Sequence, residues 1–329
     1  MMADLTTKYL GLNLKSPIIV GSSELNSSVE KIIKHEAAGA GAVVLKSLFE
    51  EQILMDIDAE RLNNMYGTYQ AVEEQLGYYL KAHSVGNYLS LIKDAKKAVN
   101  IPVIASISCV SSVEWIDFAK KVEDAGADAI EINMFILPAN TDMESKVIEN
   151  IYFDIANKIT STVSIPVSLK ISSYISGMAN FAQKLSYTRI KGLVLFNKFY
   201  SPSIDIEKEA VVSGSLHSTS ADNAMPLRWI GILNEKVTCD LAASTGVHTS
   251  KDVISNILVG ANAVQMVSSI FEKGEKQIDT VLTELSAWMD KKGYKTIEEF
   301  RGKLSQKEVK NPMLFERAQF MKYFADGGK

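Results

Sequence analysis

The stretch EDAGADAIEINM, Glu123–Met134, contains a helix end, a glycine, a short link of small residues and an apolar strand. The same order occurs in EAAGAGAVVLKS, Glu36–Ser47, and in LVGANAVQMVSS, Leu258–Ser269. Glycine adopts at low cost the left-handed conformation that ends many helices. A fourth version, YTRIKGLVLFNK, ends in the strand Gly192–Lys198. The repetition predicts a chain built from helix–strand units.

Four further apolar segments complete a set of eight predicted strands. Two of them, NIPVIASIS (Asn100–Ser108) and SIPVSLKIS (Ser164–Ser172), carry proline where a strand begins, a position that sheets tolerate. The other two are PIIVGSS (Pro17–Ser23) and TCDLAAST (Thr238–Thr245). Near-continuous apolar runs are typical of parallel strands that are buried on both faces. The eight strands are expected to start near residues 17, 42, 102, 129, 165, 192, 239 and 263.

The intervals between these strands hold amphipathic patterns such as VEWIDFAKKVEDAG and KDVISNILVGA, which are typical of helices. Eight strand–helix units predict an α/β fold of the TIM (β/α)8 barrel type. The alternative is a doubly wound open sheet, which would favour a glycine-rich dinucleotide turn after the first strand. This chain has GSSELNSS at that point, so we expect the barrel.

Four segments lie outside the eight units. The first, DLTTKYLGLNLKSP, predicts a hairpin that turns at Gly11 and closes the barrel floor. Long insertions follow the second strand (about 49–83, expected to form a lid) and the sixth strand (about 199–223, rich in serine). The tail, about 293–329, carries two helical patterns, TIEEFRGKL and NPMLFERAQFMKYF. We expect one domain over 1–329, with the barrel at about 17–290 and a C-terminal helical extension.

Composition excludes several classes of protein. The 329 residues are 47% hydrophobic and 22% charged, with a formal net charge of −4, which gives no support for a nucleic-acid or anionic-membrane surface. No apolar run is long enough to span a bilayer, and the N-terminus has no apolar signal core. The two cysteines, Cys109 and Cys239, lie far apart in the sequence, which argues against a zinc site and against a disulfide scaffold. We expect a protein of the reducing cytoplasm.

Polar residues stand at the C-terminal ends of the predicted strands, where barrels place their catalytic groups. Lys46 and Lys170 each interrupt an apolar strand, and a buried ammonium needs a partner. That partner is either an anionic ligand or Glu131, in a structural salt bridge. The seventh and eighth strands end in STGVHTSKD and SSIF, whose small residues lead into helix N-termini and can offer N–H groups to a phosphate. Together these features suggest a phosphorylated cofactor beside a small anionic substrate.

These residues resemble the dihydroorotate dehydrogenase family of flavin-dependent TIM barrels, from YLGLNLKSPIIVGSSE to GANAVQMVSSIF. The segment LGLNLKSP, before the first predicted strand, matches the family's LGLxLxNP. Lys46 and Lys170 match the family's two strand lysines. LFNKF puts Asn197 at the asparagine of the family's TNT segment. STGVHTSKD matches TGGIxTGxD, and QMVSS matches QIGTA.

The resemblance implies that FMN lies across the barrel mouth. Its phosphate would meet Gly246, Val247, Ser268 and Ser269, and its ring side would meet Ser22, Lys46, Ser47, Ser106, Asn133 and Lys170. Lys170 would stabilise the anion of the reduced flavin. The substrate would meet Lys46 and Asn133, which also face the ring, together with Asn140 and Asn197. Members of the family oxidise dihydroorotate to orotate in pyrimidine biosynthesis by hydride transfer to FMN.

One family residue is missing. After the strand-four asparagine the family has NxSCPN, whose cysteine, or serine in another class, removes the substrate's C5 proton. This chain has NMFILPAN, in which Phe135, Ile136 and Leu137 occupy the place of the base and cannot accept a proton. A positioned general base contributes about 10²–10⁴-fold to rate. Cys109, at the end of strand three, is the first replacement candidate, although a small buried filler is its ordinary role.

Other departures and candidates are smaller. Thr245 replaces the first glycine of GGI, and LHSTSAD replaces a GGxSG segment. Tyr174, Tyr200 and His217 are further base candidates that more often serve as loop or surface residues. His248, in TGVHT, is expected to be a solvent-facing residue at a helix start.

The sequence is therefore identified as a divergent, FMN-dependent member of the dihydroorotate dehydrogenase family that lacks the usual Cys or Ser base. One alternative is a flavin-dependent reductase or dehydrogenase of another small anionic substrate. Another is a non-catalytic flavoprotein subunit that uses the tail helices as its interface. A third is an aldolase-like barrel with Lys170 as a Schiff-base lysine. The expected partners are an electron-transfer protein and a second copy of the chain, because related barrels are commonly dimers.

Overall fold

A computed structural model describes residues 3–49, 85–108 and 114–317. Eight parallel strands form a closed barrel, in which each neighbouring pair is hydrogen-bonded and β4 pairs with β6 to close the circle. The barrel strands are β3 (Ile18–Val20), β4 (Ala42–Val44), β6 (Val103–Ser108), β7 (Ala129–Asn133), β8 (Val167–Ile171), β9 (Gly192–Leu195), β12 (Asp240–Ala243) and β13 (Ala263–Met266). The short strand β5 (Leu48–Phe49) adds a parallel pairing to the end of β6. The predicted TIM barrel is confirmed.

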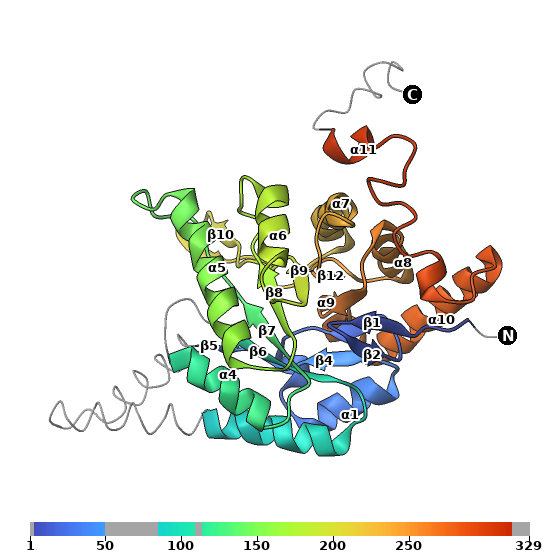
Figure 1. Ribbon diagram of the computed structural model, residues 1–329, viewed down its shortest axis with the longest axis horizontal. Coiled ribbons are helices and arrows are strands. Elements are labelled where there is room, and N and C mark those ends of the chain that lie inside the picture. The colour runs from blue at the N-terminus through green and yellow to red at the C-terminus, as the bar shows by residue number, and fades with distance from the viewer. Residues whose placement is uncertain (1–2, 50–84, 109–113, 318–329) are drawn as a thin grey trace, which may run out of the picture.

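Helices surround this barrel (Figure 1). They are α1 (Val29–Ala37), residues 85–98, α4 (Glu114–Asp124), α5 (Ser145–Thr162), α6 (Met178–Ser186), α7 (Ala224–Leu233), α8 (Ser250–Val259), α9 (Ser268–Lys273) and α10 (Lys276–Lys292). Within the described parts of the chain, no helix is both long enough and apolar enough to cross a membrane.

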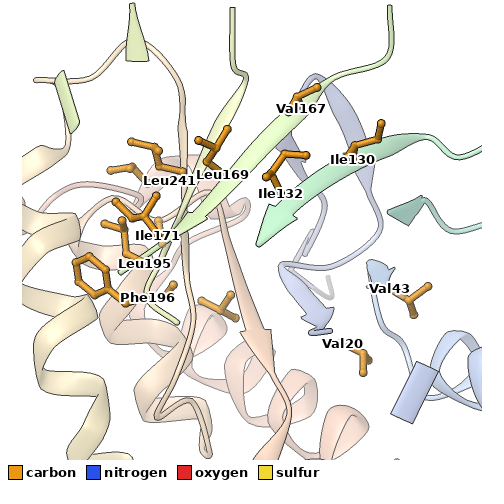
Figure 2. Packing of buried hydrophobic residues seen from close by; sticks show 14 of the residues in the cluster. Val20, Val43, Ile130, Ile132, Val167, Leu169, Ile171, Leu195, Phe196 and Leu241 are labelled. Atoms are coloured by element: carbon orange, nitrogen blue, oxygen red, sulfur yellow. The ribbon is translucent and has the colours of Figure 1, made fainter. Parts of the chain in front are cut away.

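In most of the barrel strands, alternate residues pack into two separate apolar clusters. Val20, Val43, Ile130 and Ile132 face outward into the core between strands and helices (Figure 2). Ile19, Ala42, Val44 and Ala129, which precede or follow them in the strands, belong to a smaller apolar cluster within the barrel. This two-residue period follows from the pleat of a β-strand. Both faces of every strand are therefore buried, as the continuous apolar runs predicted.

The expected hairpin closes the barrel floor. Strands β1 (Thr7–Tyr9) and β2 (Leu12–Leu14) pair antiparallel, with Leu10 and Gly11 at the turn. Tyr9, Leu10 and Leu14 belong to the inner apolar cluster. A Cβ on Gly192 would lie only 2.5 Å from Leu10 Cδ2, so a glycine there admits the hairpin.

The repeated helix–glycine–strand segments share a second feature, a hydrogen bond from the backbone before a later strand to a glutamate near the helix end. Gly39 and Gly126 have φ values of 101° and 96°, which close α1 and α4. In the helix preceding each joint, a glutamate accepts a hydrogen bond from the backbone just before the next proline-opened strand. Glu36 Oε1 accepts from Asn100 N at 2.8 Å, and Glu123 Oε1 accepts from Ser164 N at 2.8 Å. In both units the glutamate therefore accepts from the residue that directly precedes Ile-Pro-Val.

The insertions and the tail differ from a plain barrel. The segment after β9 forms an antiparallel hairpin, β10 (Pro202–Asp205) with β11 (Ala210–Ser213), followed by the 3₁₀ helix η2 (Ser220–Asn223). Residues 50–84, the expected lid, lie outside the described residues.

The prediction of a helix over TIEEFRGKL is wrong. The structure has only the 3₁₀ helix η3 (Ile297–Glu299) followed by turns, because Gly302 N and Leu304 N donate to the carbonyls of Ile257 and Leu258 at the end of α8. The second tail pattern forms one turn, α11 (Met313–Glu316), and residues 318–329 lie outside the described part.

Candidate active site

One cavity of about 240 Å³ lies at the C-terminal ends of the barrel strands. Its lining includes nine of the residues that the sequence singled out: Ser22, Lys46, Ser47, Asn133, Lys170, Asn197, Gly246, Val247 and Ser268. They come from seven different barrel strands or the loops that follow them, so only closure of the barrel brings them together. This is the end at which barrels of this type bind their ligands.

Lys170 lies at the base of the cavity. Its Nζ donates to Gln265 Oε1 at 2.9 Å, and Gln265 Nε2 donates to Glu131 Oε2 at 2.5 Å. Burial lowers the pKa of Lys170, and burial raises the pKa of Glu131 against the pull of Lys170 and Gln265. Lys170 and Glu131 therefore do not form the salt bridge that was the alternative to a ligand, because the Gln265 amide lies between them. Lys170 still lines the cavity, so its charge is available to a ligand.

A row of hydroxyl groups lies beside this lysine. Ser47 Oγ is 3.0 Å from Ser22 Oγ and 2.7 Å from Ser106 Oγ, and it accepts from Asn133 Nδ2 at 3.3 Å. Ser22 Oγ also accepts from Ser47 N at 3.0 Å. Ser106 is fully buried behind Ser47 and does not line the cavity. The row fixes the orientation of the Asn133 amide from one side.

Two asparagines that line the cavity have buried side-chain oxygens without a hydrogen-bond donor among the described residues. Asn197 Nδ2 donates to the carbonyls of Met134 (2.9 Å) and Lys170 (3.3 Å), so its Oδ1 points away from both. No described residue donates to Asn133 Oδ1, Asn197 Oδ1 or the buried Glu131 Oε1. A buried acceptor without a donor costs about 1–3 kcal/mol. Such atoms are expected where a ligand supplies the missing N–H or O–H groups.

Lys46 has a partner that the sequence analysis did not find. It forms a salt bridge with Glu24, in the 3₁₀ helix η1 (Glu24–Asn26), and both side chains are partly exposed at the cavity. The hydrogen bond from Lys46 lowers the pKa of Glu24. Lys46 is therefore charge-balanced within the protein, whereas Lys170 reaches a carboxylate only through an amide.

The turn after β12 forms the opposite end of the cavity. Thr245 and Gly246 have φ values of 77° and 80°, and Thr245 Oγ1 donates to Phe196 O at 3.0 Å. A Cβ on Gly246 would lie 2.2 Å from Asn223 N, so glycine is required by packing as well as by conformation. Ser268 and Val247 line the cavity here, but the Ser269 side chain does not, because it is fully buried and donates to Val247 O.

The prediction that His248 faces solvent is wrong. Its side chain is buried, and Nε2 lies 3.2 Å from the hydroxyl of Ser218, which reaches this turn from the segment after β11. His248 directly precedes Thr249, the N-cap of α8, which forms a capping box with Asp252. The backbone N–H of His248 also donates to Asp252 Oδ2. The local sequence could not reveal this contact, because Ser218 is distant in the chain.

The loop after β7 supplies an aromatic wall. Phe135 lines the cavity, and its ring packs edge-on against Phe199 at 5.3 Å between centroids. Phe199 in turn packs edge-on against Tyr174 at 5.2 Å. Ile136 is buried and Leu137 is 58% exposed. The three residues at the place of the family's base therefore offer only apolar surface.

Asn140 does not line the cavity. Asn140 is exposed, and its Oδ1 accepts from Asp142 N within its own loop. Cys109 lies outside the described residues. Gln265, Ser218 and Glu24 line the cavity but were not expected as site residues. The strand-end position of Gln265 was the one available signal for it.

Comparisons with known proteins agree with this geometry. The family model described as dihydroorotate dehydrogenase matches residues 4–289. The chain is 25% identical to dihydroorotate dehydrogenase B (NAD(+)), catalytic subunit, of Thermoplasma acidophilum, over 92% of this chain and 99% of that protein. It is 24% identical to dihydroorotate dehydrogenase A (fumarate) of Lactobacillus helveticus, over 89% of this chain and 96% of that protein.

Proposed function

Because this chain belongs to the dihydroorotate dehydrogenase family, we propose that it is an FMN-dependent oxidoreductase of a small anionic substrate. Dihydroorotate is the first candidate. The observation that carries the proposal is that Lys170, Asn133 and Asn197 line one cavity, and that the buried amide oxygens of the two asparagines have no donor among the described residues. A ring that bears N–H groups and a negative charge complements these three groups.

The chain's residues fit FMN at both ends of the cavity. Ser22, Ser47, Asn133 and Lys170 would hold the ring, and Gly246, Val247 and Ser268 would hold the phosphate. Bound FMN supplies the acceptor for the hydride that leaves the substrate. Lys170 supplies a buried positive charge near the ring, which favours the anionic reduced form.

The proton that accompanies the hydride needs a separate acceptor. Phe135, Ile136 and Leu137 have no atom that can take it. This observation favours a second candidate, a flavin-dependent dehydrogenase or reductase of another small anionic substrate that needs no base at this loop. The aromatic wall then serves as apolar surface for that substrate.

The relatives' names support a proposal about partners. Because several are called catalytic subunits, we propose that this chain also passes electrons to a separate protein. The hairpin of β10 and β11 exposes Ile204, Ile206 and Val211, a suitable face for that protein or for a second copy of the chain. We also propose a cytoplasmic location.

The absorption spectrum of the purified protein tests the cofactor. Visible flavin bands, with FMN rather than FAD released on denaturation, are expected. A colourless protein that does not bind added FMN would reject the proposal, and a Schiff base trapped at Lys170 by borohydride would favour the aldolase instead. Anaerobic mixing with dihydroorotate then tests the substrate, because bleaching of the flavin reports its reduction.

A further inference from the structure

Three residues that line the cavity have no part in the proposed flavin contacts. They are Phe135, Lys198 and Leu216. Phe135 lies in the loop after β7, Lys198 directly follows Asn197 after β9, and Leu216 lies between β11 and η2. Their chemistry therefore indicates what kind of molecule binds beside the flavin.

The aromatic wall and Lys198 are close to one another. The side chain of Asn197 donates to Met134 O at 2.9 Å, so the segment after β9 runs against the start of the loop after β7. Just beyond this contact, the rings of Phe135 and Phe199 pack edge-on at 5.3 Å between centroids. Lys198 is the residue between Asn197 and Phe199, and it lines the cavity as Phe135 does. A cation and an apolar ring therefore stand beside each other.

The ammonium of Lys198 is held only loosely within the protein. Its Nζ is 3.5 Å from Asp222 Oδ1, and its side chain is 33% exposed. Asp222 has closer partners, because its Oδ2 accepts from Thr219 N at 2.7 Å and from Thr219 Oγ1 at 3.2 Å. Lys198 can therefore move to a ligand without leaving this carboxylate unpaired.

The other two lysines among the described residues of the cavity lining have their own partners. Lys46 hydrogen-bonds directly to Glu24, and Lys170 donates to Gln265 at the base of the cavity and faces the proposed flavin ring. An anionic group of the substrate therefore finds its counter-charge at Lys198.

The surface beside Lys198 is apolar. Phe135 presents its ring to the cavity, and Leu216 is 74% exposed although it lines the same cavity. Removing apolar surface from water is favourable, whereas burying polar groups against it without partners is not. A substrate with a hydrocarbon group on this side therefore fits better than one with polar groups around its whole edge.

We propose that the substrate is a carboxylate that carries an aromatic or aliphatic group, with the carboxylate at Lys198 and the apolar group against Phe135 and Leu216. The inference rests on the proposed function, because it concerns the substrate of the same flavin site. Lys198 and Phe135 are then the residues that determine which anion the site accepts.

The test uses the flavin-loaded protein and four probes: cinnamate, cinnamamide, crotonate and orotate. Cinnamamide lacks the charge of cinnamate, crotonate has a methyl group in place of the phenyl group, and orotate is a polar ring. Isothermal titration calorimetry gives a dissociation constant for each probe. Cinnamate is expected to bind about tenfold or more tightly than any of the other three, because it alone offers both a carboxylate and an aromatic group.

Lys198→Met tests the charge. It is expected to reduce the preference for cinnamate over cinnamamide by about tenfold or more, because the variant loses the hydrogen bond to a charged group. Lys208→Met is the matched control, since Lys208 Nζ also lies near a carboxylate, 3.4 Å from Asp205 Oδ2, but Lys208 is not among the residues that line the cavity.

Phe135→Ala tests the apolar wall. It should reduce the preference for cinnamate over crotonate by about fivefold or more and leave the preference for cinnamate over cinnamamide unchanged. Leu137→Ala is the control in the same loop, because Leu137 is 58% exposed and is not among the lining residues. If the alanine variant does not fold, Phe135→Leu, which loses only the aromatic face, should give a smaller reduction in the same direction.

The outcomes separate this proposal from the proposed function. Orotate that binds as tightly as cinnamate, or an unchanged preference in both the Lys198 and the Phe135 variant, overturns the proposal and leaves the flavin site standing. Lys198→Met protein that binds FMN more weakly but riboflavin equally well would place Lys198 at the phosphate of the cofactor and also overturn it. Wild-type protein that binds no flavin overturns the proposed function itself.

Discussion

At the scale of single residues, Lys170 differs from an ordinary buried ion-pair lysine. Its ammonium reaches Glu131 only through the Gln265 amide, so part of its field remains available to a ligand in the cavity. A positive charge in a site that excludes water has a strong effect on a nearby developing negative charge.

Lys170→Met is therefore expected to lower the reduction potential of the bound flavin and to slow its reduction. The change removes the charge and keeps most of the side-chain volume. A spectroelectrochemical titration measures the potential. Lys191→Met is the control, because Lys191 is exposed and precedes the first residue of β9, at the opposite end of the barrel from the cavity. An unchanged potential in the Lys170 variant would mean that the lysine acts only as a structural partner of Gln265.

Phe135, Ile136 and Leu137 lead to a second prediction at this scale. Dihydroorotate should reduce the bound flavin at least about 10²-fold more slowly than it does in a family member that carries the cysteine, because a positioned base contributes about 10²–10⁴-fold. Anaerobic stopped-flow absorbance measures both rates. A fast rate would show that another residue is the base, and Cys109→Ala would be the first variant to test it.

Thr245 has a φ of 77°, a conformation that β-branched residues rarely adopt. Thr245→Ala and Thr245→Gly both lose the hydrogen bond to Phe196 O, but only glycine also removes the Cβ that makes this conformation unfavourable. The glycine variant is expected to be more stable than the alanine variant by about 1 kcal/mol. Urea unfolding compares them, and an alanine variant of equal or greater stability would argue against strain at this turn.

At the scale of secondary-structure elements, the glutamates of the repeated joints connect each helix to the start of a later strand. Glu123 accepts from Ser164 N and Ile165 N, and it forms an ion pair with Lys120. Burial opposes its ionisation, but the hydrogen bonds from Lys120 and Ser164 prevail and lower its pKa to about 2.

The pH dependence of stability follows from the direction of that shift. A carboxylate whose pKa is depressed in the folded state contributes stability above its unfolded pKa of 4.5 and loses it as the pH falls toward about 2. Glu123→Gln should be less stable than the wild type at pH 7 by about 1 kcal/mol, and the gap should shrink below pH 4.5. Chemical denaturation across this range measures the gap, and a constant gap would exclude a contribution from ionisation.

At the scale of the whole molecule, the site exists only in the closed barrel, because its residues come from strands on all sides. A ligand that binds only the folded barrel stabilises it according to its concentration. FMN at about 100 times its dissociation constant is expected to raise the free energy of unfolding by about 2.7 kcal/mol. Thermal unfolding with and without FMN measures the effect, and FMN that leaves the transition unchanged would place its binding outside the folded barrel.

The sequence by itself determined the barrel. Apolar runs with glycine joints and proline openings fixed the positions of all eight strands, because strand burial and helix ends depend on neighbouring residues. The predicted strands also placed Lys170, Asn133 and Asn197 at C-terminal strand ends, and therefore at the same end of the barrel.

Only the tertiary structure decided which side chains meet there. Gln265 rather than Glu131 receives the lysine, Ser218 meets a histidine that the sequence assigned to the surface, and Gly302 binds the end of α8 instead of continuing a helix. Each of these contacts joins residues far apart in the chain. Local propensity contains no information about such partners, because they are set by how the barrel closes and by which groups are then left buried.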